Sequence, residues 1–269
     1  MSDPIVRTED LSKSFGKVHA VRDVNFEVEE GEVMALVGDN GAGKSTLIKM
    51  LCGVLQPSDG DIYVRGDRVE FHNYNDARHA GIETVYQDLA LANKQTVSAN
   101  VFLGHEPIQD NALGRLLRLV DEDRMRQESA DALDRVKIPV DPDARVQNLS
   151  GGQQQAVAIA RALQTDPDIL IMDEPTSALS IEGVRNVLNV VRNLREQGLT
   201  IILISHNIQQ VLAIADRISV LHQGTLVGVR EAANSDREEI VSMMMGAGDE
   251  STEEIDLGVD QDTGTESTA

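Results

Sequence analysis

A glycine-rich loop that directly follows a short apolar run constrains the fold of this chain more than any other feature. Residues 34–37 read MALV, and the loop over 38–46 reads GDNGAGKST. A short, continuous apolar run is typical of a strand that is buried on both faces of a parallel sheet. The loop has the spacing GxxxxGK[ST], whose glycines let successive backbone N–H groups surround phosphate oxygens. The matching residues are Gly38, Gly43, Lys44 and Ser45. The stretch therefore predicts a strand, a phosphate-binding loop and a helix, in that order.

The side chains of this loop predict how it would hold a nucleotide. Lys44 would bring a positive charge to the phosphates, and the hydroxyl of Ser45 would coordinate Mg²⁺. The helix expected to begin near Lys44 would direct the positive end of its dipole at the same anion. We therefore assign the phosphate-binding loop to Gly38, Asp39, Asn40, Gly41, Ala42, Gly43, Lys44, Ser45 and Thr46.

Two further apolar runs indicate that this strand belongs to a larger parallel sheet. One lies in DILIMDEP at 168–175, and the other lies in TIILISH at 200–206. Between them, the apolar residues of 181–198 recur at helical spacing, and Gly198 closes the pattern. Strand, helix and strand in this order predict a parallel βαβ unit. Near the N-terminus, period-two spacing predicts a half-buried strand that contains Val24, Phe26 and Val28.

Acidic residues and a histidine follow these two apolar runs. Asp173 and Glu174 come after the first run, and His206 comes after the second. An Asp at the end of a parallel strand beside a phosphate-binding loop is placed to hold Mg²⁺ through water. The adjacent Glu174 is the candidate general base for the attacking water. Because ligands collect at the carboxyl ends of strands in α/β sheets, His206 is placed to donate to the terminal phosphate. The sequence thus predicts catalytic roles for Lys44, Glu174 and His206.

The chain divides by composition into three parts. Residues 88–147 are helix-rich and charged and lack a buried-strand pattern, so they predict a helical lobe inserted into the α/β core. Residues 247–269 are polar, acidic and rich in Gly and Thr, and they cannot bury enough apolar surface to fold. We therefore expect one folded domain over 1–246 and an acidic, disordered tail over 247–269. A regulatory role for that tail is the alternative.

The charge of the chain argues against one class of partner. Asp and Glu number 45 against 24 Lys and Arg, and the final 32 residues, with ten acids, supply about half of the net charge of −21. Nucleic acid is not expected as a partner, because phosphate binding needs clustered Lys and Arg. An acid excess with few lysines also fits a halophilic source, where a high net charge keeps a protein soluble. A mesophilic protein with an acidic tail is the alternative.

Membrane segments and cysteine chemistry are not expected either. No stretch approaches the ~20 apolar residues that a membrane-spanning helix needs, and the opening MSDPIVRTEDL lacks the pattern of a signal peptide. We expect a cytoplasmic protein that reaches a membrane only through a partner. The single cysteine, Cys52, lies in the apolar stretch LIKMLCGVL and is expected to be a small core residue.

Together these segments resemble the ATP-binding-cassette (ABC) ATPases over residues 5 to about 246. GDNGAGKST is similar to the Walker A loop of that family, and ILIMDE is similar to its Walker B strand. LSGGQ at 149–153 is similar to the signature motif, Gln87 falls at the Q-loop, and His206 falls at the switch histidine. The five motifs arrive in family order. The resemblance implies an α/β fold, namely a P-loop NTPase cassette with a parallel-sheet core, an N-terminal antiparallel β portion and an inserted helical lobe.

The resemblance also implies roles that the residues alone do not. In this family two cassettes meet head to tail, and the signature of one closes on the γ-phosphate held by the other. The lysine-free helix start that would bind the partner's ATP consists of Ser150, Gly151, Gly152 and Gln153. The resemblance further implies that Phe15 stacks on adenine and that Gln87 contacts the nucleotide and Mg²⁺. Hydrolysis is then expected to require a dimer.

One position departs from the family pattern and points to a branch of the family. The loop after the Walker B strand usually reads SALD, whereas here it reads SALS, so Ser180 cannot supply the carboxylate that crosses the dimer interface. Sugar importers resembling the ribose, xylose and fructose uptake systems often carry Ser or Thr at this point. The stretches 79–106 and 203–228 resemble the same branch. Many of those proteins fuse two cassettes, whereas this chain has one.

The sequence thus predicts the ATP-hydrolysing energy subunit of a monosaccharide importer, with ATP and Mg²⁺ as cofactors. The expected partners are integral permease subunits, a second cassette and, through the permease, an extracellular solute-binding protein. The chain would lie peripherally on the inner face of the cell membrane. Two alternatives stay open: an importer ATPase for a nucleoside, an amino acid or another small solute, and a soluble ATPase of assembly, translation or repair. A binding-only module is disfavoured, because every hydrolytic residue is present.

Overall fold

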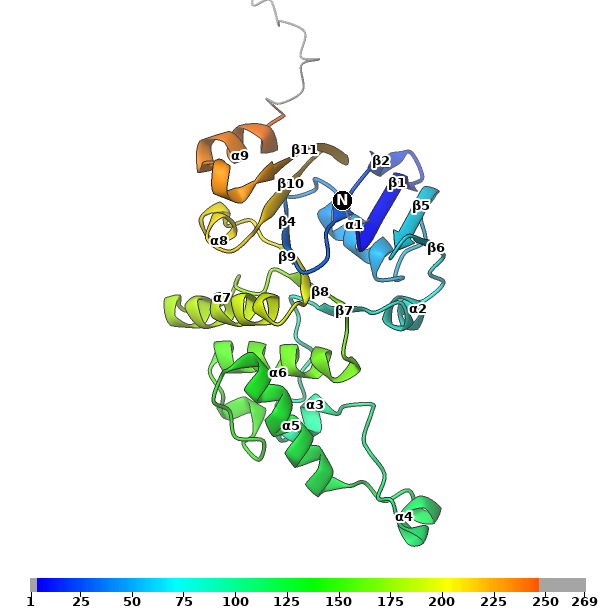
Figure 1. Cartoon of the computed structure of the whole chain (residues 1–269), viewed down its shortest axis with the longest axis vertical. Helices are drawn as coiled ribbons and strands as arrows, with labels where there is room; N and C mark the ends of the chain where they lie inside the picture. Colours follow the sequence, from blue (N-terminus) through cyan, green and yellow to red (C-terminus); the bar gives the residue numbers. More distant parts are fainter. Residues whose placement is uncertain (1–3, 247–269) are drawn as a thin grey trace, which may run out of the picture.

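The computed structural model describes residues 4–246, so the tail predicted over 247–269 lies outside the described residues. In Figure 1 the strands gather at one end of the molecule and the helices α3 to α6 at the other. Within residues 4–246, every helix is too short or too polar to cross a lipid bilayer.

The larger sheet has six strands in the order β11–β10–β4–β9–β8–β7. Neighbouring strands from β10 to β7 are parallel, and β10 pairs with β11 in an antiparallel manner. β4 and β9 are buried along their whole length, as expected for strands covered on both faces. The predicted parallel core is therefore confirmed. The strands are β4 (Val33–Val37), β7 (Ile82–Val85), β8 (Ile169–Asp173), β9 (Thr200–Ile204), β10 (Arg217–His222) and β11 (Thr225–Glu231).

The smaller sheet forms the predicted N-terminal antiparallel portion. Its strands run in the order β2–β1–β5–β6, with β3 also paired to β1, and every pair is antiparallel. The strands are β1 (Val6–Phe15), β2 (Val18–Val24), β3 (Glu27–Val28), β5 (Asp59–Val64) and β6 (Asp67–Val69).

The single strand expected from period-two spacing near the N-terminus is wrong in extent. β2 ends at Val24 and β3 begins at Glu27. At Phe26 the backbone N–H donates to the Thr8 hydroxyl at 2.9 Å, and the same hydroxyl donates to the Val24 carbonyl at 2.8 Å. A side chain thus replaces a ladder partner and interrupts the strand. Val24, Phe26 and Val28 are nevertheless all buried. The apolar spacing thus predicts correctly that these side chains are buried, but not that one strand contains all three.

Helices cover both faces of the larger sheet. α7 connects β8 to β9, which confirms the predicted βαβ unit. Its buried side chains include Val187, Val191 and Leu194, and the chain turns away at Gly198, where φ is +90°. The helices around this sheet are α1 (Lys44–Leu51), α2 (Tyr74–His79), α7 (Ile181–Glu196), α8 (Ile208–Leu212) and α9 (Arg237–Met244).

The remaining helices lie at the far end of the molecule in Figure 1, and three of them, α3, α5 and α6, share one apolar cluster with a face of the sheet. The cluster joins buried side chains of α3, α5 and α6 to Leu170 of β8 and Leu203 of β9. Their sheet neighbours Ile171 and Ile202 belong to the cluster on the other face. Helix α6 begins after the predicted lobe of 88–147 yet packs with it. These helices are α3 (Val97–Val101), α4 (Ala112–Leu117), α5 (Glu122–Val136) and α6 (Gly151–Ala162), with 3₁₀ turns η1 (Val146–Asn148), η2 (Leu163–Thr165) and η3 (Ala232–Asn234).

Cys52 is a buried residue of this core, as predicted. It lies at the end of α1, and its sulfur is 2.9 Å from the hydroxyl of Thr84. Burial raises the pKa of the Cys52 thiol to about 12, so it stays protonated and poorly nucleophilic at neutral pH.

Candidate functional site

The register of the parallel sheet brings the predicted site residues to one edge. Leu36 of β4 pairs with Ile204 of β9, and Ile204 pairs in turn with Asp173 of β8. All three strands run in the same direction, so the loops that follow them leave from the same edge. The phosphate-binding loop, the Asp173–Glu174 pair and His206 therefore meet there, although they are far apart in sequence.

Two glycines hold the loop after β4 in a shape that a side chain would prevent. Gly38 has φ +155°, and a Cβ there would lie 2.3 Å from the carbonyl oxygen of Leu221. Gly43 has φ +103°, and its Cβ would lie 2.5 Å from the carbonyl oxygen of Ala20. Gly43 is also the N-cap of α1 and makes no side-chain cap bond. The N–H of Thr46 donates to the carbonyl of Gly43 at 3.0 Å, and the N–H groups of Lys44 and Ser45 at the helix start are placed to bind an anion.

Lys44 lies inside this loop with its side chain turned onto the backbone. Its ammonium donates to the carbonyl oxygens of Gly38 at 2.6 Å and Asp39 at 3.0 Å. The residue is only 9% exposed, and burial lowers the pKa of Lys44 while the charge of Glu174 opposes this shift. An ammonium so desolvated gains from phosphate oxygens, which form charge-assisted hydrogen bonds.

A cavity of about 480 Å³ opens above the loop. It brings Phe15 and Gln87, which the family resemblance singled out, together with the loop and the two acids. Gly38 and Asp39 are not part of its wall and contribute carbonyl groups to Lys44 instead. Ala20 and Ile204 line it without belonging to any motif. The lining residues are Phe15, Ala20, Asn40, Gly41, Ala42, Gly43, Lys44, Ser45, Thr46, Gln87, Asp173, Glu174 and Ile204.

The two acids differ in their surroundings. Asp173 is half-buried, and both burial and the neighbouring charge of Glu174 raise its pKa. A carboxylate in this position is stabilised by a nearby cation. Glu174 has φ +52°, a left-handed conformation that is uncommon for a residue other than glycine. Its N–H donates to the carbonyl of Ile204 at 3.0 Å, which holds the turn against β9.

His206 lies beside Glu174 and not in the cavity wall. Its Nδ1 is 2.5 Å from Oε2 of Glu174. The side chain of Glu174 is 18% exposed and that of His206 is 64% exposed. The histidine therefore contacts the predicted general base from the solvent side. Nothing in the spacing of the two residues along the sequence reports this contact.

The second predicted cradle lies apart from the cavity. Ser150 is the N-cap of α6: its hydroxyl accepts from the N–H of Gln153 at 3.3 Å, and the Gln153 side chain accepts from the N–H of Ser150 at 3.0 Å. A Cβ at Gly152 would lie 3.2 Å from Cα of Gly183, so the glycine lets α6 and α7 approach closely. None of Ser150, Gly151, Gly152 and Gln153 lines the cavity around Lys44.

Ser180 has a local role at the start of α7. It is the N-cap of that helix, and its hydroxyl accepts from the N–H of Gly183 at 3.2 Å. Serine is among the preferred N-cap residues. The residue thus keeps a capping oxygen where the family pattern usually has a carboxylate.

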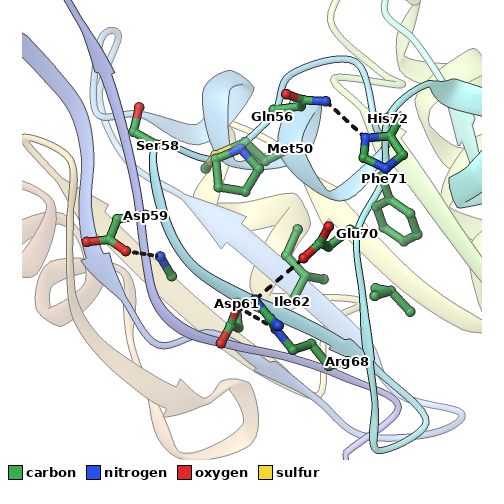
Figure 2. A pocket seen from close by; sticks show the side chains of 13 residues that line it. Met50, Gln56, Ser58, Asp59, Asp61, Ile62, Arg68, Glu70, Phe71 and His72 are labelled. Atoms are coloured by element: carbon green, nitrogen blue, oxygen red, sulfur yellow. Dashed lines mark hydrogen bonds and ion pairs between the residues drawn. The ribbon is translucent and has the colours of Figure 1, made fainter.

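A second cavity, of about 450 Å³, lies beside strands β5 and β6 (Figure 2). Four of its polar side chains pair with one another: Arg68 is 2.6 Å from Asp61, and Gln56 is 3.2 Å from the His72 ring. It contains none of the residues that the motifs single out. The candidate site is therefore the cavity around Lys44.

Comparison with known proteins agrees with this assignment. The model of the ABC transporter family matches residues 21–177. The chain is 44% identical to the xylose/arabinose import ATP-binding protein of Sulfolobus acidocaldarius, over 91% of this chain and 94% of that protein. It is 41% identical to a ribose import ATP-binding protein of Streptomyces avermitilis, again over 91% of this chain but only 45% of that protein. The chain thus spans about half the length of the ribose relative.

Solved structures show the same fold. One is the ADP conformation of an ATP-binding cassette of an ABC transporter, which is 28% identical, with a TM-score of 0.76 over 90% of this chain and 95% of the other. Another is a dimeric, post-hydrolysis cassette bound to ADP and Pi, which is 25% identical, with a TM-score of 0.69 over 86% of this chain and 100% of the other.

Proposed function

This chain belongs to the ABC transporter family, and on that premise we propose that it is the ATP-hydrolysing subunit of a monosaccharide importer. As a family member it is an ATPase. The observation that carries the proposal is the convergence of the phosphate-binding loop, Gln87, Asp173 and Glu174 on one cavity. The import ATP-binding proteins for xylose/arabinose and for ribose support a monosaccharide as cargo.

The cavity suits a nucleoside triphosphate with its base at Phe15. Phe15 ends β1 at the rim and is 49% exposed, so its ring is free to stack on adenine. The loop N–H groups and the first turn of α1 would hold the phosphates. Lys44 would then exchange its two carbonyl partners for phosphate oxygens. The volume of about 480 Å³ is in the range of small-ligand sites.

The oxygen donors of the same cavity fit Mg²⁺. Ser45, Gln87 and Asp173 all line it, and hydroxyl, amide and carboxylate oxygens are the ligands that Mg²⁺ accepts. The raised pKa of Asp173 marks a carboxylate that a cation would stabilise. The bound ion would neutralise charge on the phosphate oxygens. In our proposal Ser45 and Asp173 orient it, with Gln87 closing the site.

Hydrolysis would use Glu174 and His206 together. Glu174 borders the cavity at the end of β8, where it can accept a proton from the water that attacks the γ-phosphate. In this proposal the contact with the His206 ring would hold the carboxylate of Glu174 in place for that step. We propose that His206 also donates to the γ-phosphate.

We propose that the complete catalytic site needs two chains. Ser150, Gly151, Gly152 and Gln153 begin an anion-binding helix start, yet they lie apart from this chain's own cavity. Placed against the cavity of a second copy, the same helix start would complete its phosphate cradle. The dimeric cassette among the related structures supports this arrangement. Closure would be favoured by ATP because ATP binds the closed dimer better than the open one.

The permease is the partner that would hold this chain at the inner face of the membrane, with a solute-binding protein on the other side. A surface for it is suggested by the segment 103–120, which includes α4 at the far tip of the molecule in Figure 1. This segment carries seven of the twelve exposed large apolar side chains of residues 4–246. Such a concentration is typical of an interaction site. The seven are Leu103, Ile108, Leu113, Leu116, Leu117, Leu119 and Val120.

Leu116→Asp tests this surface. Leu116 is 77% exposed, so we expect the variant to fold normally and to keep basal ATPase activity within about twofold, because exposed substitutions rarely destabilise. Recovery of the permease with the tagged chain should fall several-fold. Val54→Asp, at an apolar residue that is 48% exposed elsewhere, is the matched control. Unchanged permease recovery with Leu116→Asp would remove the segment from the interface.

Gentle solubilisation of native membranes with this chain tagged tests the proposed function itself. We expect an integral permease and a solute-binding protein to copurify, and we expect a pentose or a related monosaccharide bound to the latter to stimulate ATP hydrolysis in the reconstituted complex. Preparations at high and low KCl test the halophilic interpretation at the same time. A complex stimulated by a nucleoside or an amino acid would correct the cargo. Copurification of soluble proteins only would overturn the importer assignment.

A further inference from the structure

The segment around Gln87 connects the nucleotide cavity to the helices at the far end of the molecule. Gln87 follows β7, is exposed and lines the cavity. The chain then continues through Leu89 and Ala90 towards α3. The position of the Gln87 amide therefore depends on the contacts that hold the chain on either side of it.

On the far side of Gln87, Arg161 holds the backbone. Its Nη2 donates to the carbonyl of Leu89 at 2.6 Å and its Nη1 to the carbonyl of Ala90 at 3.2 Å. Ala90 has φ +47°, so the chain is turned sharply at the point where it is held. Burial lowers the pKa of Arg161 and the nearby charge of Glu83 opposes that shift. The planar guanidinium suits two acceptors at fixed spacing, which an ammonium would not match.

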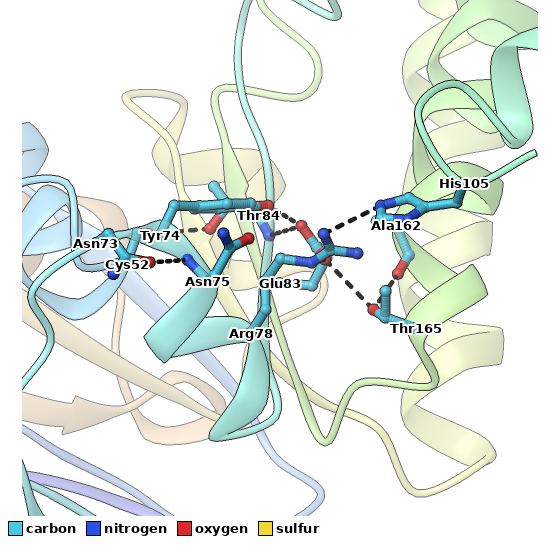
Figure 3. Close-up of polar contacts among 10 residues, drawn as sticks. All are labelled: Cys52, Asn73, Tyr74, Asn75, Arg78, Glu83, Thr84, His105, Ala162 and Thr165. Atoms are coloured by element: carbon cyan, nitrogen blue, oxygen red, sulfur yellow. Dashed lines mark hydrogen bonds and ion pairs between the residues drawn. The ribbon is translucent and has the colours of Figure 1, made fainter.

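Before Gln87 in the chain, a polar cluster surrounds Glu83 of β7 (Figure 3). It includes Thr165 of η2, the turn that directly follows α6. Glu83 is only 6% exposed, and burial raises its pKa. The hydroxyl of Thr165 shares its one proton between Oε2 of Glu83 at 3.3 Å and the carbonyl of Ala162 at 3.1 Å, and the same Oε2 pairs with Nε of Arg78 at 2.8 Å. The Tyr74 hydroxyl donates to Oε1. Arg78 in turn contacts His105 at 3.1 Å, a residue just beyond α3.

Arg161 and Thr165 are four residues apart at the end of α6 and in the following turn η2. We propose that they form a clamp that grips the chain before and after Gln87, with Arg161 as the positioning residue for the Gln87 amide. Because α6 begins after the cap Ser150, the helix that holds the backbone beside Gln87 also presents the second cradle. Its twelve residues span about 18 Å as a rigid rod. The inference rests on the proposed function, since it assigns the residues that join the two half-sites of one chain.

Loss of the clamp should impair ATP hydrolysis and leave ATP binding unchanged. Arg161 donates to the carbonyls of Leu89 and Ala90, whereas Lys44 donates to those of Gly38 and Asp39, so ATP binding should persist when Arg161 is replaced. Gln87 would then sample several positions, and the geometry of the metal and the attacking water would suffer. A contact that served folding alone would lower the melting temperature without acting through Gln87.

Arg161→Gln in the full-length chain is the test, with Gln87→Ala and the double variant completing a cycle. We expect Arg161→Gln to lower kcat by up to about 100-fold, which is the cost that a misplacement of about 1 Å can carry in an active site, and to leave the Kd of a fluorescent ATP analogue within about twofold. The double variant should be no slower than Gln87→Ala alone. Amide hydrogen exchange over 86–92 should quicken. Arg192→Gln is the matched control, because Arg192 also donates to a backbone carbonyl, that of Ala213 at 3.2 Å, far from Gln87 in sequence.

Two outcomes would overturn the clamp: kcat losses that add fully in the double variant, or exchange over 86–92 that is the same in Arg161→Gln and Arg192→Gln. Arg161→Lys, which keeps the charge but not the paired donors, should resemble Arg161→Gln in kcat. Thr165→Val removes the other contact of the clamp, that between the Thr165 hydroxyl and Glu83, with a smaller change in side-chain volume. A wild-type chain without ATPase activity, alone and in the permease complex, would contradict the proposed function instead. The exchange measurement tests the clamp without requiring turnover.

Discussion

Lys44→Ala is expected to abolish measurable ATP hydrolysis and to weaken ATP binding about 10- to 150-fold. The ammonium of Lys44 lies buried at the cavity, and within residues 4–246 its hydrogen bonds go to the carbonyls of Gly38 and Asp39. A hydrogen bond to a charged group contributes about 1.5–3 kcal/mol, which corresponds to that loss of affinity. The additional charge of the transition state deepens the effect on hydrolysis. Titration with a fluorescent ATP analogue and a phosphate-release assay measure the two quantities.

The control for this prediction is Lys49→Ala. Lys49 lies on the same helix, α1, but is exposed and does not line the cavity. We expect its ATP affinity and turnover to stay within about twofold of wild type, because an exposed charge contributes little. Wild-type kinetics in Lys44→Ala, with unchanged folding by circular dichroism, would contradict the assignment of the loop.

Glu174→Gln is expected to bind ATP normally and to hydrolyse it about 10²–10⁴ times more slowly. The substitution keeps the size and the left-handed turn of residue 174 but removes the proton acceptor, and general base catalysis contributes about that factor. Because ATP then persists, the closed dimer should accumulate. Single-turnover kinetics and size-exclusion chromatography with ATP and Mg²⁺ measure the rate and the dimer. His206→Ala should lower the rate less, since His206 contacts Glu174 from the solvent side.

Glu182→Gln is the matched control for Glu174→Gln. Glu182 lies in the first turn of α7, is exposed and does not line the cavity. Its turnover should equal that of the wild type. If Glu174→Gln hydrolysed ATP at the wild-type rate, Glu174 would not be the base. If Glu174→Gln hydrolysed ATP slowly but did not dimerise with ATP, Glu174 would remain the candidate base and the proposed two-chain site would be contradicted.

The phosphate-binding loop could be predicted from sequence because its chemistry is local. The positive φ values of Gly38 and Gly43 and the carbonyl oxygens that would clash with a Cβ explain why glycine is required there. The apolar runs that became β4, β8 and β9 are buried on both faces, and such strands need no information beyond their own composition. Ser150 at the start of α6 is likewise a local capping signal.

Contacts between segments that are far apart in sequence could not be predicted from local patterns. Nothing in the spacing of Arg161 and Leu89 predicts their hydrogen bond, since 72 positions separate them. The split of the N-terminal strand also depended on a partner, the hydroxyl of Thr8, that the apolar pattern does not contain. The role of Ser180 was not predicted either. The family pattern shows only that a carboxylate is missing at this position, whereas the structure shows that the serine caps α7.

Local sequence was enough to predict the pieces of the proposed site: the glycine loop suited to phosphate, the acids that end β8, and the helix start that would repeat the cradle without a lysine. These follow from backbone conformations and short-range hydrogen bonds that a few adjacent residues encode. Which of these pieces lie together in space depends on the packing of the whole fold. The parallel register places Leu36, Ile204 and Asp173 side by side, and packing of α6 carries Arg161 to the backbone beside Gln87. Such contacts depend on burial and shape across the whole core, and no short stretch of chain records them.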